Sequence, residues 1–310
     1  MTGMKTVVMG YHTMGCLGFD ALLAHGFEVA AVFTHRDDPH EEVWWESLAT
    51  RAEAQGIPVH YPEDAKDPAV GDLISSYAPD FLFSFYYRFM IPPAILALAD
   101  RGALNLHGSL LPRYRGRAPV NWVLVEGQTE TGVSLHYMVE KPDAGALVDQ
   151  ERVAIDPADT AFTLYGKLEH AARQLLDRAL PALAAGTAQA SPMDLSQGSY
   201  RGGRKPADGW IDWSWPAGRI YDLVRAVTHP YPGAFTALRD RRLLVWWALP
   251  VAGVDAEPGM VTTVDADGIT VAAGEGGVRL VTLQLEGQPE LPACSLALAA
   301  GIAPGERLGS

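Results

Sequence analysis

Cysteine is scarce in this sequence. Cys16 and Cys294 are the two cysteines among its 310 residues, and they lie far apart along the chain. Two such cysteines indicate no disulfide framework, and the histidines and acidic residues show no spacing typical of a metal site. We therefore expect a protein of a reducing cytoplasm that binds no metal.

Long apolar runs and an excess of positive charge are also missing. No apolar run reaches the roughly 18 residues that a membrane span needs, and residues 1–9 lack the basic-then-apolar layout of a signal peptide. The formal net charge is −13. Because binding along a nucleic acid requires clustered Lys and Arg, we expect neither a nucleic-acid nor a membrane partner. A small anionic ligand held by a few local arginines is compatible with this charge.

A dinucleotide-binding loop is not indicated. The segment GYHTMG (10–15) follows the first predicted strand, but it has two glycines and lacks the full G-x-G-x-x-G pattern. We interpret it as a plain turn from strand to helix and expect no NAD or FAD.

The first part of the chain alternates strands with helices. Buried strands are predicted at 5–9, 28–34, 57–61, 80–85, 104–107, 133–138 and 146–153, and helices at 15–24, 41–55, 69–77, 92–98 and 162–184. This alternation predicts an α/β domain over residues 1–190, with a Rossmann-like, mostly parallel sheet and helices on both faces.

The pattern changes after residue 190. Residues 191–209 are rich in Gly, Ser, Pro, Arg and Lys and are predicted to be a linker. Short strands then follow at 235–239, 243–248, 259–264, 269–272 and 278–285, with hairpin turns at Asp267-Gly268 and Gly276-Gly277. We expect residues 210–305 to form a small C-terminal β-barrel domain of the OB-like kind.

A pair of polar residues interrupts the apolar strand within 102–120. Asn105 and His107 are two positions apart, so on an extended strand they point to the same face where the strand meets a loop. An imidazole can accept a proton near neutral pH, and a carboxamide N–H can stabilise an oxyanion. Asp143, in the loop after the strand at 133–138, would orient the imidazole ring. We predict Asn105, His107 and Asp143 as catalytic residues suited to acyl transfer to an amine, although a lone strand histidine is more often structural.

The residues around this pair form a long motif. NLHGSLLPRYRG (105–116) is followed by APVNW (118–122) and ETGVS (130–134). This motif resembles that of the formyltetrahydrofolate-dependent formyltransferases, and HPYPGAF (229–235) is similar to the second domain of such enzymes. The resemblance implies that 10-formyltetrahydrofolate is the co-substrate. It also implies that His107 transfers the proton, Asn105 stabilises the oxyanion and Asp143 tunes His107.

The resemblance also implies a folate site, and the arginines suggest an anion site. The predicted folate-binding residues are Phe89, Met90, Ile91, Arg117, Val139, Glu140, Lys141 and Pro142. The residues that could hold an anionic substrate, or simply be solvated in loops, are Arg113, Arg115, Arg201 and Arg204. We interpret His12, His35 and His136 as structural or near the substrate.

Three functions compete at this point. The resemblance favours N-formylation of a nucleotide-activated amino sugar, UDP-4-amino-4-deoxy-L-arabinose in particular, a step of lipid A modification and polymyxin resistance. A methionyl-tRNA formyltransferase would need a basic surface, whereas the segment 34–42 is mostly acidic. The third alternative is a non-catalytic module that binds folate or a nucleotide sugar. The identity of the amino sugar, the oligomeric state, and whether the chain stands alone or belongs to a bifunctional protein stay open.

Overall fold

The structure is a computed structural model that describes residues 3–39 and 41–309. The chain divides into two compact units, each built from several stretches. The N-terminal unit contains the chain up to Pro119 together with Glu130–Ala154 and Gly166–Gly202, and the C-terminal unit contains Val120–Thr129, Ile155–Tyr165 and the chain from Gly203 on. The sequence pattern predicts consecutive domains instead, and those limits stay a prediction.

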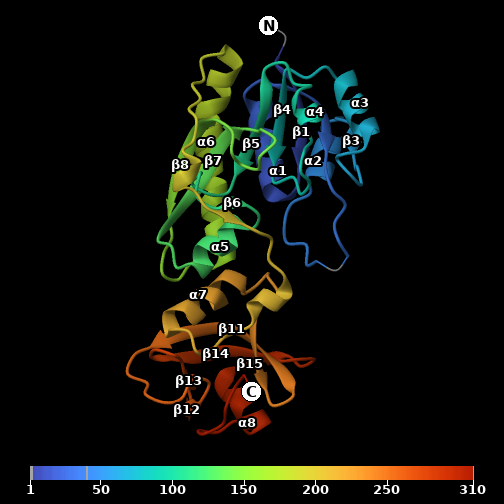
Figure 1. Cartoon of the computed structure of the whole chain (residues 1–310). Helices are drawn as coiled ribbons and strands as arrows, with labels where there is room; N and C mark the ends of the chain where they lie inside the picture. The colour runs from blue at the N-terminus through green and yellow to red at the C-terminus, as the bar shows by residue number, and fades with distance from the viewer. Residues whose placement is uncertain (1–2, 40, 310) are drawn as a thin grey trace. The chain divides into compact units, whose positions relative to one another are not determined.

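A seven-stranded sheet forms the centre of the N-terminal unit (Figure 1). Its order is β3-β2-β1-β4-β5-β7-β8, and the strands are β1 (Lys5–Gly10), β2 (Glu28–Phe33), β3 (Val59–His60), β4 (Phe81–Phe85), β5 (Gly102–His107), β7 (Glu130–Tyr137) and β8 (Leu147–Ala154). The first five run parallel, and β7 and β8 are antiparallel additions. The prediction of a mostly parallel sheet is confirmed.

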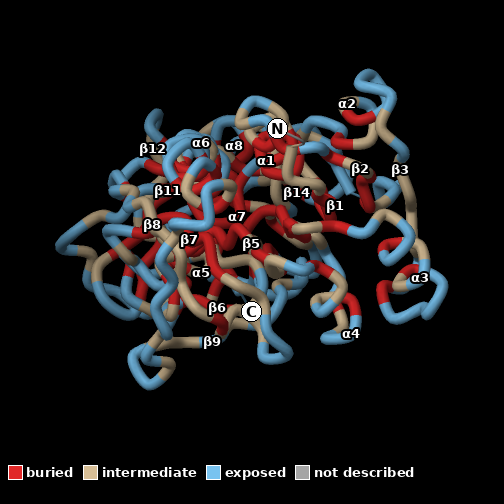
Figure 2. The backbone as a smooth tube through the Cα atoms, turned by 90° about the horizontal axis from the view of Figure 1, so that it is seen from above, coloured by how far each residue is buried: buried red, intermediate tan, exposed pale blue. Residues whose placement is uncertain are grey.

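Helices cover both faces of this sheet because its strands are apolar on both sides. Val7, Leu82 and Ala103 on one face pack in a cluster with Val70 and Ile95, which belong to α3 (Pro68–Ser76) and α4 (Pro93–Leu96). On the other face, α1 (His12–Ala24) packs so closely that a Cβ on its Gly18 would meet the ring of Phe85. Figure 2 shows the burial that results along β1 and β5.

The longest predicted helix after β2 is shorter than expected. The prediction of helix over 41–55 is wrong for its first half, because α2 spans only Leu48–Ala54. Ser47 caps it, its Oγ accepting a hydrogen bond from the N–H of Thr50 at 3.2 Å. The preceding tryptophans, Trp44 and Trp45, contact the ring of His12 and so hold the chain out of a helix.

The predicted linker contains ordered structure. Residues 191–209 include two short 3₁₀ turns, Leu195–Gln197 and Pro206–Gly209, and the strand β9 (Tyr200–Arg201). β9 pairs in parallel with β6 (Arg115–Gly116), which the sequence pattern did not predict. This small sheet ties the predicted linker to the motif that carries the candidate catalytic residues.

The C-terminal unit contains an antiparallel sheet, as predicted. Its order is β10-β11-β14-β13-β12, with β15 paired to β14, and the strands are β10 (Ala234–Leu238), β11 (Arg241–Val251), β12 (Val261–Asp265), β13 (Gly268–Ala272), β14 (Gly277–Leu285) and β15 (Glu290–Pro292). Both predicted hairpin turns are found, since β12 pairs with β13 and β13 with β14. The predicted helix after residue 210 is α7 (Ala217–Val227).

Two further helices of the chain were not predicted. α8 (Ala293–Ala300) follows the last strand, and α5 (Pro119–Val125) begins just after the motif. α6 (Ala161–Ala185) matches its prediction, and Arg178 in it pairs with Asp149 at 3.1 Å and Glu151 at 2.7 Å on β8. Within the described part of the chain, no helix has both the length and the apolar character that crossing a membrane requires.

Candidate active site

Four polar side chains share one face of the sheet where β5 ends. Asn105 pairs with His136 and His107 pairs with Ser134 across the antiparallel β5–β7 ladder. Directly opposed residues of a ladder point to the same side. This face is apolar at Ala103 and becomes polar toward the carboxyl end of β5, the edge at which α/β sheets bind ligands.

The carboxylate of Asp143 lies at the centre of these side chains. Its Oδ1 is 3.6 Å from His107 Nδ1, 3.5 Å from His136 Nε2 and 3.4 Å from Asn105 Nδ2. Its Oδ2 accepts a hydrogen bond from the backbone N–H of Gly116 at 2.8 Å. The structure therefore brings together the three predicted catalytic residues and adds His136.

Backbone geometry holds Asp143 in place. Its φ of 48° lies in the left-handed region, which Asp tolerates better than most residues. Gly145 follows closely, and a Cβ there would collide with the carbonyl oxygen of Tyr137. The loop from Asp143 to Gly145 thus needs a residue without a side chain at its end.

Asp143 stays ionised because of its neighbours. Burial alone would raise its pKa, but the charge of His107, the hydrogen bond and charge of His136, and the Gly116 N–H together hold the pKa of this carboxyl well below its usual range. A buried carboxylate of this kind stabilises positive charge on the adjacent imidazoles.

The ring of His107 is held by one nitrogen and open at the other. His107 is 6% exposed, and its Nε2 is 2.8 Å from the carbonyl oxygen of Tyr114. A carbonyl oxygen only accepts, so Nε2 carries the hydrogen and the neutral ring has its lone pair on Nδ1, toward Asp143. Tyr114 aims this carbonyl with a φ of 57°, a strained value for a bulky residue, supported by a 2.8 Å bond from its N–H to Ser199 Oγ.

This arrangement can move a proton and stabilise an anion. His107 Nδ1 can take a proton, and the ionised Asp143 then faces the imidazolium. Asn105 is half-buried, so its carboxamide can reach a ligand at the edge of the sheet. Ser109 is no nucleophile in this setting, because its Oγ donates to the carbonyl oxygen of Arg113 at 2.7 Å.

The predicted folate-binding residues lie in two loops at this edge. Residues 86–91 follow β4 and residues 138–143 follow β7, and Ile91 and Met138 pack in the same cluster. Phe89, Met90 and Val139 are exposed apolar side chains, while Ile91 is buried. Glu140, Lys141 and Pro142 continue the second loop, Lys141 and Glu140 being exposed.

The structure gathers most of the predicted arginines on the β6–β9 pair. Arg113 and Arg201 both lie against the Tyr114 ring, at 5.6 and 5.9 Å from its centroid. Arg117 is exposed, and its N–H donates to the carbonyl oxygen of Arg201. Arg115 is 8% exposed, and its Nε has no hydrogen-bond partner within residues 3–39 and 41–309.

Arg204 belongs to the C-terminal unit. Its guanidinium lies over the ring of Trp122 at 4.8 Å and donates to the carbonyl oxygen of Asp208 at 2.9 Å. Burial lowers its pKa from the ordinary value. The structure gives no grouping of Arg204 with the four arginines of β6 and β9.

An aromatic pocket of about 200 Å³ lies beyond β1 and β2, in the N-terminal unit. Its lining includes Tyr11, His35, Arg36, Trp45 and Tyr61. The Arg36 guanidinium lies over the Tyr61 ring at 4.4 Å, and the Tyr11 ring is 5.5 Å from both His35 and Trp45. Because β1 is two strands from β5, this aromatic pocket is about 10 Å from the catalytic strand at the usual strand spacing.

Two histidines beside this pocket are neutral. Burial, aided by the charge of Arg88, lowers the pKa of His12 to about 3 and that of His35 to about 4. His12 stacks on Trp45 with a centroid distance of 4.6 Å. The aromatic pocket therefore presents uncharged rings with arginines at its border.

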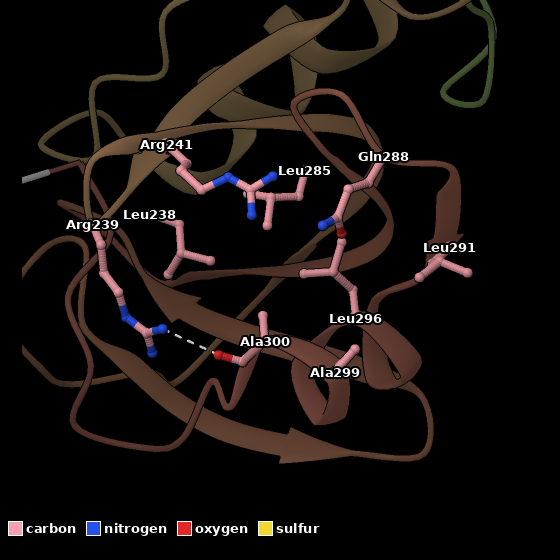
Figure 3. Close-up of a pocket in the computed structure, with 9 residues that line it drawn as sticks. All are labelled: Leu238, Arg239, Arg241, Leu285, Gln288, Leu291, Leu296, Ala299 and Ala300. Carbon is pink, nitrogen blue, oxygen red and sulfur yellow. Dashed lines mark hydrogen bonds between the residues drawn. The ribbon is translucent and has the colours of Figure 1, made fainter.

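A second cavity, of about 170 Å³, belongs to the C-terminal unit (Figure 3). Leucine and alanine side chains line it, together with Arg239, Arg241 and Gln288. The guanidinium of Arg239 is already bound to Glu306 at 2.9 Å and to the carbonyl oxygen of Ala300 at 3.2 Å. This cavity offers no group for acid–base chemistry.

Sequence reasoning missed His136 as a partner of the site and missed the aromatic pocket. His136 stands alone in an apolar strand, and only the β5–β7 register places it opposite Asn105. No group of three or more His, Cys, Asp and Glu side chains in the described ranges is arranged to hold a metal.

Comparison with known families gives the class of the protein. A family model described as formyl transferase matches residues 4–180, and one described as formyl transferase, C-terminal domain, matches residues 204–300. The fold and site thus define an enzyme that transfers a one-carbon acyl group. The chain belongs to the formyl transferase family and is a formyltransferase.

Several solved structures share this fold. HypX from Aquifex aeolicus in complex with tetrahydrofolic acid is 16% identical with a TM-score of 0.64, over 95% of this chain and 47% of that one. The chain thus spans about half the length of HypX. The N-formyltransferase from Helicobacter canadensis, in complex with folinic acid and dTDP-3-aminofucose, is 18% identical with a TM-score of 0.67, over 89% of this chain and 98% of that one. WlaRD, a sugar 3N-formyl transferase, is 17% identical with a TM-score of 0.67, over 92% and 99%.

Proposed function

We propose that this enzyme transfers the formyl group of 10-formyltetrahydrofolate to the amine of a nucleotide-activated amino sugar. The observation that carries the proposal is the convergence of Asn105, His107 and Asp143 within 3.6 Å at the carboxyl edge of the sheet. Solved formyltransferases of this fold, with bound folates and a dTDP-linked amino sugar, support it.

The chemistry follows from the orientation of these three side chains. His107 takes a proton from the substrate amine at Nδ1, while its Nε2–H stays bound to Tyr114. The amine nitrogen then bonds to the formyl carbon, and an Asn105 N–H donates to the oxygen that becomes negative. Asp143 stabilises the imidazolium, which returns the proton to the folate nitrogen as the old carbon–nitrogen bond breaks. The products are a formamide and tetrahydrofolate.

The two loops after β4 and β7 suit the folate. A pterin has flat faces and an edge of hydrogen-bonding groups, so it needs apolar side chains and loop backbone rather than charge. Phe89, Met90 and Val139 provide exposed apolar surface beside the catalytic strand. We assign the folate to these loops, with Ile91, Arg117 and residues 140–142 around it.

The aromatic pocket suits the nucleotide. Its neutral rings can stack on a base, and Arg36 and Arg88 at its border can attract phosphate. Asp37 accepts a hydrogen bond from Tyr11 Oη at 2.6 Å and retains capacity to accept one from a ribose hydroxyl. The estimated 10 Å to β5 leaves room for a diphosphate and a sugar ring.

The arginines of β6 and β9 support an anionic substrate. A buried guanidinium without a partner on Nε is costly unless a ligand neutralises it. Arg115 is such a group, and it lies between the two residues whose backbone contacts His107 and Asp143. We assign Arg113, Arg115 and Arg201 to the substrate, and keep Arg204 as a weaker candidate.

The particular substrate that we propose is UDP-4-amino-4-deoxy-L-arabinose. The motif stretches are similar to those of the formyltransferase domain of the bifunctional polymyxin-resistance protein ArnA, and this similarity supports a role in lipid A modification. The two free cysteines suit a cytoplasmic setting.

A panel of amines tests this proposal. The enzyme is incubated with 10-formyltetrahydrofolate and UDP- or dTDP-linked amino sugars, with methionyl-tRNA as the competing acceptor, and released tetrahydrofolate is followed. We expect turnover with a UDP-linked amino sugar. Turnover with methionyl-tRNA alone would replace the proposal with a tRNA formyltransferase, and ligand binding without any transfer would indicate a binding module.

A further inference from the structure

His136 is the one buried imidazole of the site to which the reaction above gives no task. It is 1% exposed, and it faces two of the three candidate catalytic residues from β7. Its Nε2 is 3.3 Å from Asn105 Nδ2 and 3.5 Å from Asp143 Oδ1. A buried histidine at this position can control what its neighbours do.

The hydrogen bond at the other nitrogen determines the tautomer. His136 Nδ1 is 2.8 Å from the carbonyl oxygen of Tyr137. The carbonyl oxygen has no hydrogen to give, so Nδ1 carries the hydrogen and the neutral ring has its lone pair on Nε2. His136 therefore offers Asn105 an acceptor.

That acceptor determines which end of the Asn105 carboxamide faces β7. An amide oxygen toward His136 would place two acceptors against each other, and the same oxygen would meet the Asp143 carboxylate at 3.4 Å. With the NH₂ group in this place, one N–H goes to His136 Nε2. The second N–H is left for Asp143 or for a ligand.

We propose that His136 is a positioning residue, which accepts one N–H of Asn105 and so directs the other N–H to the formyl oxygen in the transition state. This inference rests on the proposed function. Without His136, the carboxamide can rotate, and its N–H groups can turn to Asp143 instead of the reacting oxygen. Binding of either substrate does not depend on this orientation, so the loss falls on kcat.

Substitutions at His136 test the geometry. His136→Gln places an amide oxygen near the position of Nε2, whereas His136→Leu fills the space with no acceptor. Since loss of one oxyanion donor lowers kcat by roughly 10²–10³-fold, we expect His136→Leu to lower kcat about 10–100-fold with both KM values within about threefold. His136→Gln should recover most of this loss.

A double-mutant cycle separates positioning from a structural role. In an Asn105→Ala background, His136→Leu should have almost no further effect on kcat, because the N–H that it directs is gone. An equal fold-loss in both backgrounds would overturn the proposal. So would a loss that disappears in Asp143→Asn but persists in Asn105→Ala, since His136 would then act through the carboxylate.

A tautomer measurement keeps the test independent of turnover and of the Leu variant's folding. Long-range ¹H–¹⁵N NMR of the wild-type imidazoles should show the hydrogen of neutral His136 on Nδ1. A hydrogen on Nε2 would overturn the proposal, because Asn105 would lose its acceptor. If the wild-type enzyme formylates no amine, the proposed function fails, whereas turnover with additive variants refutes only the role of His136.

Discussion

Removal of the charge at Asp143 gives the sharpest prediction. Asp143→Asn keeps the shape of the side chain and an oxygen for the Gly116 N–H, but it removes the negative charge 3.6 Å from His107 and 3.5 Å from His136. At an effective dielectric constant of about 20, one such pair of charges is worth about 4 kcal/mol. The imidazolium forms during the reaction, so half to all of this energy should be lost from the transition state.

A loss of about 2–4 kcal/mol corresponds to a fall in kcat of roughly 30- to 1,000-fold, at 1.36 kcal/mol per tenfold change. The assay is the initial rate of tetrahydrofolate release with both substrates saturating. Asp177→Asn is the matched control, since it removes a carboxylate from an exposed pair with His25 at 2.9 Å. The control should keep the wild-type rate. An Asp143→Asn variant that is folded and within threefold of wild type would refute the reasoning.

Stability gives a second measurement on the same variant. The folded-state pKa of Asp143 lies below the ordinary value of 3.8, so the ionised carboxylate stabilises the fold above about pH 4, and this contribution is lost as the pH falls. The free energy of unfolding of wild type should therefore fall more steeply below pH 4 than that of Asp143→Asn. Parallel profiles would contradict the assigned pKa shift.

Four further predictions concern other parts of the account. His107→Ala and Asn105→Ala should each lower turnover by roughly 10²-fold or more with the melting temperature little changed, and a near-normal rate in either folded variant would contradict the mechanism. Arg115→Met should raise the KM of the nucleotide sugar about tenfold or more without loss of stability; a rise in the folate KM instead would reassign Arg115 to the glutamate tail. His12 has a folded-state pKa of about 3 against 6.5 unfolded, so its contribution is complete above about pH 6.5 and is lost as the pH falls. The free energy of unfolding should thus drop by about 2 kcal/mol between pH 7 and 5 in wild type relative to His12→Asn, by chemical denaturation, and equal drops would count against a buried neutral ring. Gly145→Ala should lower both kcat and the melting temperature, because its Cβ would meet backbone at Tyr137, and unchanged values would show that the loop can yield.

The sequence predicted the central sheet because buried parallel strands appear as apolar runs. It also placed Asn105 and His107 on one face, since the spacing of two on a strand is a local property. The position of Asp143 beside them came only from family resemblance, because residues 105 and 143 meet through the pairing of β5 with β7 and a left-handed turn.

Other features had no local signal. His136 acquires its environment from a partner 31 residues away, so it could not be told from a structural histidine. The helix predicted over 41–55 begins only at Leu48, because tertiary contacts of Trp44 and Trp45 with His12 override local propensity. The helix α8 was hidden by the surrounding β pattern, although its sequence ACSLALAA favours a helix.

The account depends on one step, the transfer of the formyl group to a sugar amine at the site of Asn105, His107 and Asp143. Single-turnover transfer of an isotopically labelled formyl group from 10-formyltetrahydrofolate to UDP-4-amino-4-deoxy-L-arabinose, followed by mass spectrometry of the sugar nucleotide, measures this step directly. We predict a labelled formamide with the wild-type enzyme, and transfer at least 10²-fold slower with His107→Ala. Label that stays on the folate, or that reaches the sugar equally fast with His107→Ala, would contradict it.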